Sequence, residues 1–279
     1  MKRKVKTKVK GFRTTDGAGV KLVRVLGNLT TKEFDPILML DSFDSINPDD
    51  YTAGFPMHPH RGIETISYVS RGKMVHRDSL GNEAGISDGE VQWMNSGFGI
   101  MHEEMVPAAE RLLGVQLWLN LPAKDKMSKP SYNSIKNEDI KEIEIEGGKI
   151  RLLAGKYGEH EGYKGDYLSM DYYDIHLNAD AEVTLTMEED DSVMVFTLLG
   201  DVYIDGEHIE EKTAVKLTEG DSLTIKNGNE KAQVLYMNSR ALNEPVAWAG
   251  PIVMNTQEEL QKAFLELRSN TFIKETAEY

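Results

Sequence analysis

The sequence of 279 residues contains no cysteine, and this absence excludes a group of chemistries. Without thiols there are no disulfides, no thiolate metal ligands and no thiol redox reactions. Any metal ion must therefore be held by histidine, aspartate or glutamate. The absence of cysteine also agrees with residence in the cytoplasm, which we expect for this protein.

Long apolar runs and an excess of positive charge are missing as well. No apolar segment approaches the length of about 18 residues that a membrane-spanning helix needs. The chain has 46 acidic and 32 basic residues, and its net charge is −14. Such a surface repels phosphates and anionic lipids, so we expect neither nucleic acid nor a membrane as a direct partner.

Lysines crowd the beginning of the chain, in MKRKVKTKVKG. No apolar region follows them, so we expect no signal peptide there. The segment could form an anion-binding patch. We favour an edge strand whose lysines face solvent while Val5 and Val9 attach it to a sheet, because lysines on an edge prevent unwanted pairing.

Short runs with strand character recur along the whole chain and are separated by Gly, Asn, Asp and Pro. They are residues 21–26, 36–43, 64–70, 73–79, 90–95, 111–121, 149–155, 172–178, 181–187, 192–206, 214–227 and 232–238. Many short strands with regular turns indicate an all-β sandwich or barrel fold. The polar stretch 121–139 interrupts this rhythm and is interpreted as a linker region.

One helix is expected near the C-terminus, in residues 255–270. Thr256 and Glu259 have the spacing of a capping box at its start. Leu260, Ala263 and Leu267 follow at helical spacing, together with Phe264.

The segment HPHRGIET places His58 and His60 two residues apart. In a strand, residues i and i+2 point to the same face, about 7 Å apart along the chain. In a helix the same spacing would turn the two rings ~200° away from each other. Pro59 favours the extended form for His58. The pair alone is weak evidence for a metal site, since alternating histidines also occur on exposed strands.

A second pair lies downstream in GFGIMHEEM, where His102 and Glu104 share one face. Three imidazoles and a carboxylate without sulfur suit Fe(II), Mn(II), Ni(II), Co(II) or Cu(II) with open positions for a substrate. Glu64 has the same parity as His58 and His60. Periodicity therefore leaves Glu64 and Glu104 open as the carboxylate ligand, and Glu64 has the alternative role of orienting an imidazole.

Other polar and aromatic residues allow plainer interpretations. The remaining histidines are expected to be surface or hydrogen-bonded residues; they are His76, His160, His176 and His208. The apolar residues near the candidate ligands are assigned to the barrel core rather than to a pocket wall; they are Phe55, Met57, Trp93, Phe98 and Met101. Gln116 either hydrogen-bonds near the site or faces solvent.

The order of HPHRGIET, DGEVQWMNSGFGIMHEEM and LNEPVAWAGPIVMNTQEEL resembles the pirin family of the cupin superfamily. The likeness extends over nearly the whole chain. It implies two cupin barrels, an N-terminal metal-binding one in residues 1–130 and a metal-free one with a short C-terminal helix in residues 140–279. It also implies the ligands His58, His60, His102 and Glu104, which selects Glu104 over Glu64.

The resemblance further implies an activity, because family members resemble quercetin 2,3-dioxygenases. The expected cofactor is one divalent metal ion, Fe(II) first, with Ni, Mn, Co, Cu and Zn as alternatives. Glu104 would act as both ligand and general base on a flavonol that O₂ then opens with release of carbon monoxide. The expected partners are an aromatic small molecule and O₂, and the expected state is a monomer.

Two other functions remain open. The first is a non-catalytic regulatory metalloprotein, similar to the transcriptional co-regulators among eukaryotic pirins. The second is a cupin enzyme with a different substrate. Fold analogy alone does not separate these functions.

Overall fold

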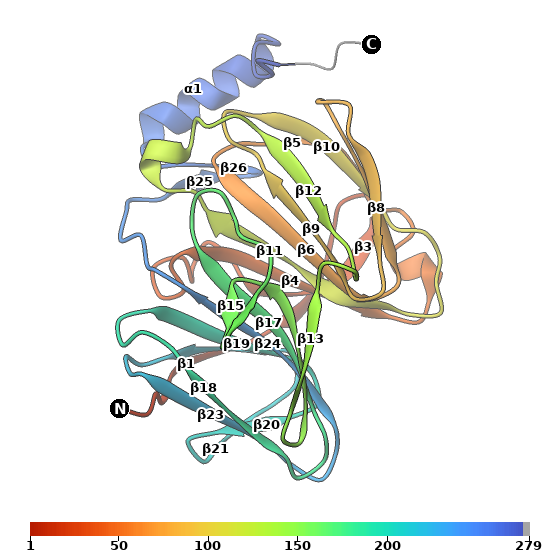
Figure 1. Cartoon of the computed structure of the whole chain (residues 1–279). Helices are drawn as coiled ribbons and strands as arrows, with labels where there is room; N and C mark the ends of the chain where they lie inside the picture. The colour runs from red at the N-terminus through yellow and green to blue at the C-terminus, as the bar shows by residue number, and fades with distance from the viewer. Residues whose placement is uncertain (276–279) are drawn as a thin grey trace. The chain divides into compact units, whose positions relative to one another are not determined.

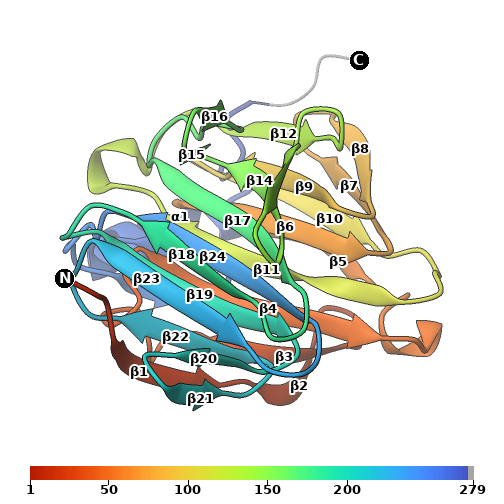
Figure 2. The same cartoon turned by 60° about the horizontal axis from the view of Figure 1, so that its bottom comes forward.

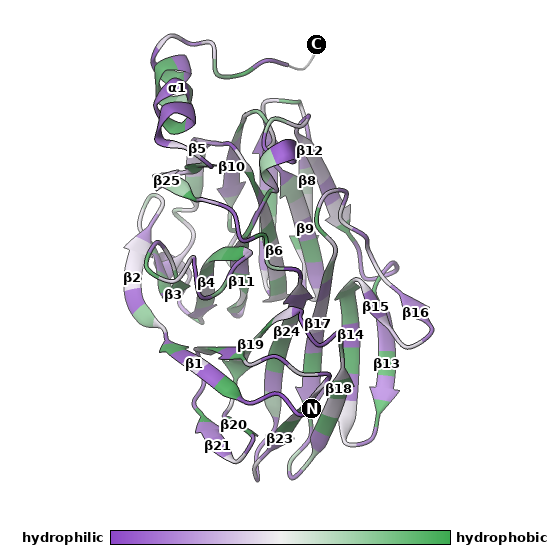
Figure 3. Ribbon diagram, turned by 90° about the vertical axis from the view of Figure 1, so that its left-hand side faces the viewer, coloured by the Kyte–Doolittle hydropathy of each residue, from purple (hydrophilic) through white to green (hydrophobic). Residues whose placement is uncertain are grey.

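The computed structural model describes residues 1–275, which consist mostly of β-strands (Figure 1). In Figure 3 the strands carry alternating hydrophobic and hydrophilic bands, as expected when one face of each strand lies against an interior. The predicted all-β class is confirmed. Most predicted strand segments correspond to single strands within a few residues, but residues 192–206 and 214–227 each contain two strands. No helix in this described part of the chain has the length and apolar character needed to cross a membrane.

Two compact units make up the chain, and each is assembled from separate segments. The unit called here the first barrel contains, among the described residues, 13–31, 37–136 and 242–275. The unit called the second barrel contains residues 1–12, 32–36 and 137–241. A division of the chain into residues 1–130 and 140–279 would place the N-terminal segment in the first barrel and the C-terminal segment in the second barrel. The structure places each of these two segments in the other barrel.

The first barrel has a larger and a smaller antiparallel sheet. The larger sheet has the strand order β12 (Ser131–Ile135), β9 (Glu90–Asn95), β6 (Ile63–Arg71), β11 (Leu112–Asn120), β4 (Ile37–Ser45), β3 (Val20–Leu26) and β2 (Phe12–Asp16). The smaller sheet has the order β5 (Phe55–His60), β10 (Ile100–Met105), β7 (Lys73–Asp78) and β8 (Glu83–Ser87). Short 3-10 helices are η1 (Pro48–Asp50) and η2 (Ala123–Asp125).

Part of the predicted linker region is a strand. β12 pairs with β9 at the edge of the larger sheet, with Tyr132 opposite Met94. The segment SYNSI has too few apolar residues to give a strand pattern by itself. This segment forms a strand because it pairs with β9. Tyr132 also stacks on His76, and the centroids of the two rings are 4.0 Å apart.

The C-terminal segment adds a two-stranded sheet, β25 (Ala247–Ala249) with β26 (Ile252–Met254), and the helix α1 (Gln257–Arg268). The predicted capping box is present, since Thr256 accepts from the Glu259 N–H and Glu259 accepts from the Thr256 N–H. Leu260 and Ala263 are buried against β25 and β26. The buried Arg61 bonds to Glu266 at 2.7 Å and so attaches α1 to the end of β5.

The second barrel repeats the design with a larger and a smaller sheet (Figure 2). The larger sheet has the order β1 (Val5–Lys10), β22 (Thr213–Leu217), β19 (Ser192–Leu199), β24 (Ala232–Ser239), β17 (Met170–Leu177), β14 (Gly148–Ala154) and β13 (Lys141–Ile145). The smaller sheet has the order β18 (Glu182–Thr186), β23 (Ser222–Asn227), β20 (Val202–Ile204) and β21 (Glu207–Ile209), and β15 (Lys156–Tyr157) pairs separately with β16 (His160–Glu161). Apolar side chains such as Val195 and Ile225 fill its interior.

The lysine-rich start of the chain forms β1, which lies at the edge of this larger sheet and pairs with β22. Its lysines are exposed and its valines half-buried, so the predicted edge strand is confirmed. Lys6, Lys8 and Lys10 form ion pairs with Glu33, Glu207 and Glu210 at 3.0, 2.9 and 2.7 Å. These acidic partners neutralise the charge that an anion-binding patch would need.

Candidate metal centre

Three histidines converge inside the first barrel because two of its strands are neighbours. β10 pairs with β5, and the register places His102 opposite His58 and Ile100 opposite His60. Since side chains alternate along a strand, the three imidazoles share one face. Their ligand atoms all lie within 4.8 Å of one another. The structure thus brings His58, His60 and His102 together.

The rings of His58 and His60 present their Nε2 atoms to the centre of this group. The Nδ1 atom of His58 lies 2.8 Å from the carbonyl oxygen of Pro56, and that of His60 lies 3.0 Å from the carbonyl oxygen of Pro251. A carbonyl oxygen can only accept, so both Nδ1 atoms carry the hydrogen. Each neutral ring therefore directs the Nε2 lone pair inward, as a metal ligand does.

His102 is oriented through two further residues. Its Nδ1 atom lies 3.3 Å from Nδ1 of His76, and Nε2 of His76 lies 2.8 Å from the carboxylate of Asp78. The carboxylate fixes the hydrogen of His76 on Nε2, so Nδ1 of His76 accepts from His102. The Nε2 atom of His102 then has a free lone pair, like those of His58 and His60.

The spacing of the three nitrogens fits a shared cation. Nε2 of His58 is 3.0 Å from Nε2 of His60 and 3.0 Å from Nε2 of His102. An ion about 2.1 Å from two nitrogens at right angles leaves those nitrogens about 3.0 Å apart. Because all three Nδ1 atoms hold the hydrogens, the facing lone pairs repel each other unless a cation lies between them.

Burial lowers the pKa of two of the imidazoles, those of His60 and His102. It lowers the pKa of His60 to about 3, with the neighbouring His58 ring as the next cause. It lowers the pKa of His102 well below the usual value, and the surrounding rings add to this effect. Burial raises the pKa of Asp78, but hydrogen bonds from His76 and Asn82 outweigh it and hold that pKa below the usual value. Burial thus favours the neutral form of His60 and His102, with the ionised Asp78 behind His76.

Glu104 lies on the same strand and the same face as His102 and is 1% exposed. In the structure its carboxylate accepts hydrogen bonds from Nε2 of Gln92 on β9 and from Nε2 of Gln116 on β11, the latter at 2.8 and 3.0 Å. Gln116 is thus buried and hydrogen-bonded rather than facing solvent. Glu64, the alternative carboxylate, accepts a hydrogen bond of 2.9 Å from the indole of Trp93.

His76 and Gln92 are the residues of this network that the sequence did not single out for it. His76 was expected to be a surface or hydrogen-bonded residue, and it is fully buried next to His102. The available signal was the shared parity of His76 and Asp78 on one strand. Because β7 pairs with β10 and Glu104 lies opposite His76, the face that His76 and Asp78 share is the face that carries His102 and Glu104. His176 and His208 instead contact carboxylates in the second barrel.

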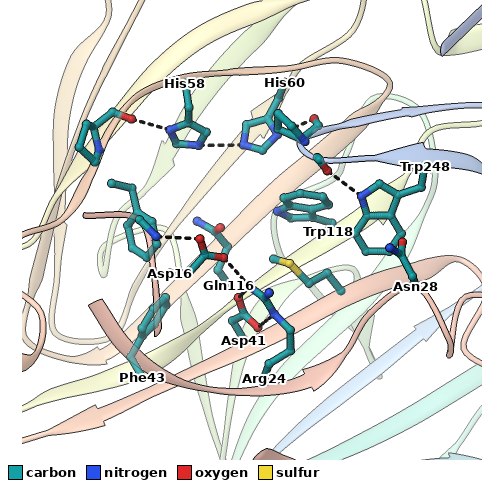
Figure 4. A pocket seen from close by; sticks show the side chains of 16 residues that line it. Asp16, Arg24, Asn28, Asp41, Phe43, His58, His60, Gln116, Trp118 and Trp248 are labelled. Atoms are coloured by element: carbon teal, nitrogen blue, oxygen red, sulfur yellow. Dashed lines mark hydrogen bonds and ion pairs between the residues drawn. The ribbon is translucent and has the colours of Figure 1, made fainter. Parts of the chain in front are cut away.

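A cavity of about 550 Å³ opens beside His58 and His60 (Figure 4). Phe55, Trp118 and Trp248 contribute aromatic walls, and the centroids of the two indole rings are 5.4 Å apart. Phe55, assigned to the core, thus also lines the cavity. The assignment of Met57 to the core is wrong, since its side chain is 49% exposed, whereas Trp93 is buried as expected.

The C-terminal segment reaches this cavity because Gly62 allows a close approach. Its φ is +80°, and a Cβ atom there would lie 1.9 Å from the carbonyl oxygen of Val253. The N–H of Val253 donates to the carbonyl of Arg61 at 3.1 Å. This contact brings Pro251 to His60 and Trp248 to the cavity wall.

The fold and the histidine group define a class, a two-barrel cupin protein with a candidate metal centre in its first barrel. The family model described as pirin matches residues 19–119, and the model of the pirin C-terminal cupin domain matches residues 172–273. The chain belongs to the pirin family. The resemblance noted in the sequence is confirmed.

Relatives of similar length support this placement. A protein of Pseudomonas aeruginosa named "putative quercetin 2,3-dioxygenase" is 39% identical, over 92% of this chain and 94% of its own length. Human pirin is 35% identical, over 96% of this chain and 93% of its own length. The crystal structure of a quercetin 2,3-dioxygenase from Acinetobacter baumannii superposes with a TM-score of 0.89 at 30% identity, covering 98% of this chain and 99% of that one.

Proposed function

We propose that this protein is a metal-dependent dioxygenase that opens flavonols such as quercetin with O₂ and releases carbon monoxide. The observation that carries the proposal is the convergence of three imidazoles beside an aromatic-walled cavity of about 550 Å³. The names of the Pseudomonas aeruginosa relative and of the Acinetobacter baumannii structure support the same reaction.

The proposed ligands are His58, His60, His102 and Glu104. The donor set fits a divalent transition metal, because nitrogen and carboxylate oxygen without sulfur suit Fe(II) and also Ni, Mn, Co, Cu or Zn. When bound, such an ion supplies Lewis acidity toward the oxygen atoms of the substrate and, if it is redox-active, electron transfer. We assign Fe(II) as the native ion in this proposal.

The residues of the chain have separate tasks in this reaction. Glu104 accepts the proton of the flavonol 3-hydroxyl group as general base. Gln116 and Gln92 hold the carboxylate of Glu104 in position through their amide groups. Trp118 and Trp248 pack against a flat ring system and keep water away from it. In the net reaction both atoms of O₂ enter the ester product, and C3 of the flavonol leaves as carbon monoxide.

The test loads the purified protein with Fe(II) under anaerobic conditions and mixes it with quercetin. Loss of the visible quercetin band and formation of carbon monoxide should require both the metal and O₂. The Glu104→Ala protein should be slower by roughly 10²–10⁴-fold, the contribution typical of a general base. The exposed His160 in β16 provides a matched control, since His160→Ala should leave the rate unchanged.

Two results would overturn the proposal. A Glu104→Ala protein with the full rate would remove the assigned base. A wild-type protein that binds metal but leaves quercetin intact in the presence of O₂ would favour the regulatory metalloprotein or another substrate.

A further inference from the structure

Across the cavity from His58 and His60 lies a cluster of charged side chains, Asp16, Arg24 and Asp41, called here the acidic wall (Figure 4). Arg24 donates to Asp41 from Nε at 2.9 Å and from Nη2 at 2.6 Å. Nη2 also donates to Asp16 at 2.6 Å. Asp16, Arg24 and Asp41 lie on β2, β3 and β4, so three adjacent strands hold the cluster in place.

The acidic wall carries a net negative charge. The hydrogen bonds that Arg24 donates to Asp41 raise the pKa of Arg24 above its usual value, so the guanidinium stays charged. Burial raises the pKa of Asp16, but hydrogen bonds from Arg24 and from the Gly17 N–H outweigh it and hold that pKa below the usual value. Burial raises the pKa of Asp41, but both of its oxygens accept from the guanidinium, as those of a carboxylate do. One cation therefore faces two carboxylates.

The wall is also rich in acceptors. Asp41 is 4% exposed and occupied by the guanidinium on both oxygens, whereas the side chain of Asp16 is 49% exposed. Among the described residues that line the cavity, Arg24 is the single lysine or arginine. An anionic group placed here meets no uncompensated cation, while a hydroxyl group can donate to a carboxylate oxygen of Asp16.

We propose that the acidic wall makes this cavity select neutral phenols and reject ligands that carry a carboxylate at the same position. The inference rests on the proposed function, because it places the chelating oxygens of the ligand at the histidine end. The flat ring system then lies against the indoles of Trp118 and Trp248 and presents its hydroxyl-bearing ring to Asp16. The histidine end and the acidic wall thus recognise opposite ends of one ligand.

The test compares two ligands that differ in one group. They are 3,4′-dihydroxyflavone and the flavonol with a carboxylate in place of its 4′-hydroxyl group. Binding to Ni(II)-loaded protein is measured without O₂, through quenching of tryptophan fluorescence. The wild-type protein should prefer the hydroxylated ligand by at least about tenfold, and added salt should reduce the preference by screening Asp16.

The Asp16→Asn protein should bind the carboxylated ligand about tenfold more tightly than the wild type does, because a like charge near the ligand is removed. It should bind the hydroxylated ligand with little change. Asp49→Asn is the matched control, since Asp49 is an exposed carboxylate of the same barrel outside the cavity. Asp49→Asn should leave both affinities unchanged.

The inference is overturned if the wild-type protein binds both ligands equally, if it binds neither, or if Asp16→Asn acts no more strongly than Asp49→Asn. A different result would contradict the dioxygenase proposal. Selective binding in these experiments without turnover of the hydroxylated ligand in air would contradict the proposed reaction and leave the selectivity intact.

Discussion

Replacing His76 by phenylalanine separates the orientation of His102 from the presence of the ligands. His76 accepts from Nδ1 of His102 and donates to Asp78, and its ring stacks on Tyr132 with an interplanar angle of 13°. Phenylalanine keeps a ring for this stacking but removes both hydrogen bonds. The Nδ1 hydrogen of His102 then has no acceptor at that position, so the ring is free to turn or to change tautomer.

The expected loss of metal affinity follows from this geometry. Removing a group that orients a metal-binding histidine typically weakens the metal complex by about 10–100-fold. This corresponds to about 1.4–2.7 kcal/mol of binding free energy. Stability should fall as well, although Asp78 keeps its bonds from the Leu80 N–H and from Asn82. One lost hydrogen bond at a charged acceptor costs about 1.5–3 kcal/mol.

Metal affinity is measured by competition with a chelating indicator, and folding by urea denaturation of the metal-free protein. His76→Gln is the conservative variant, since an amide can both donate and accept, and it should recover part of the affinity. His160→Phe replaces an exposed histidine and should bind metal like the wild type. A folded His76→Phe protein with wild-type affinity would refute the role given to His76.

Three further changes test other parts of the structure. Gln116→Leu removes a donor from the buried Glu104 carboxylate; urea denaturation should show a loss of about 1–3 kcal/mol in the metal-free protein, and an unchanged midpoint would contradict the network. Burial lowers the pKa of Lys126 to about 7. Between this value and the unfolded value near 10.5 the unfolded chain binds more protons, so stability should rise with pH by about 2 kcal/mol from pH 7 to 9 relative to Lys126→Met; parallel pH profiles of the two proteins would show that the pKa is not lowered. Thr256→Ala removes the N-cap of α1 and should cost about 1 kcal/mol in thermal or urea unfolding, with Thr184→Ala on an exposed strand position as comparison.

Local patterns predicted much of the fold. Strands follow from alternation along a few residues, and α1 follows from a capping box and helical spacing, so neither needs knowledge of distant partners. The sequence predicts a linker rather than the strand β12, because this segment shows little alternation of polar and apolar residues. The placement of β1 in the second barrel depends on pairing with residues more than 200 positions away, such as Val9 with Ala214. The placement of α1 in the first barrel likewise depends on contacts with residues that are distant in the sequence.

For the candidate site, the sequence predicts the three histidines but not the residues that surround them. Parity placed His58, His60 and His102 on shared faces, and the neighbouring strands brought them together. Sequence spacing could not show that His76 supports His102, since that contact depends on the pairing of β7 with β10. The sequence also does not predict which residues line the cavity, because Trp248 and Arg24 come from segments far from the histidines in the chain.

The most direct test of the account is the structure of the protein loaded with Fe(II), or with Ni(II) as a stable substitute, with the ion located by anomalous scattering. The account predicts a single ion within about 2.0–2.2 Å of the three Nε2 atoms, with a carboxylate oxygen of Glu104 completing the protein ligands. An ion bound elsewhere, or three histidines that keep their positions with no ion between them at saturating metal, would contradict it.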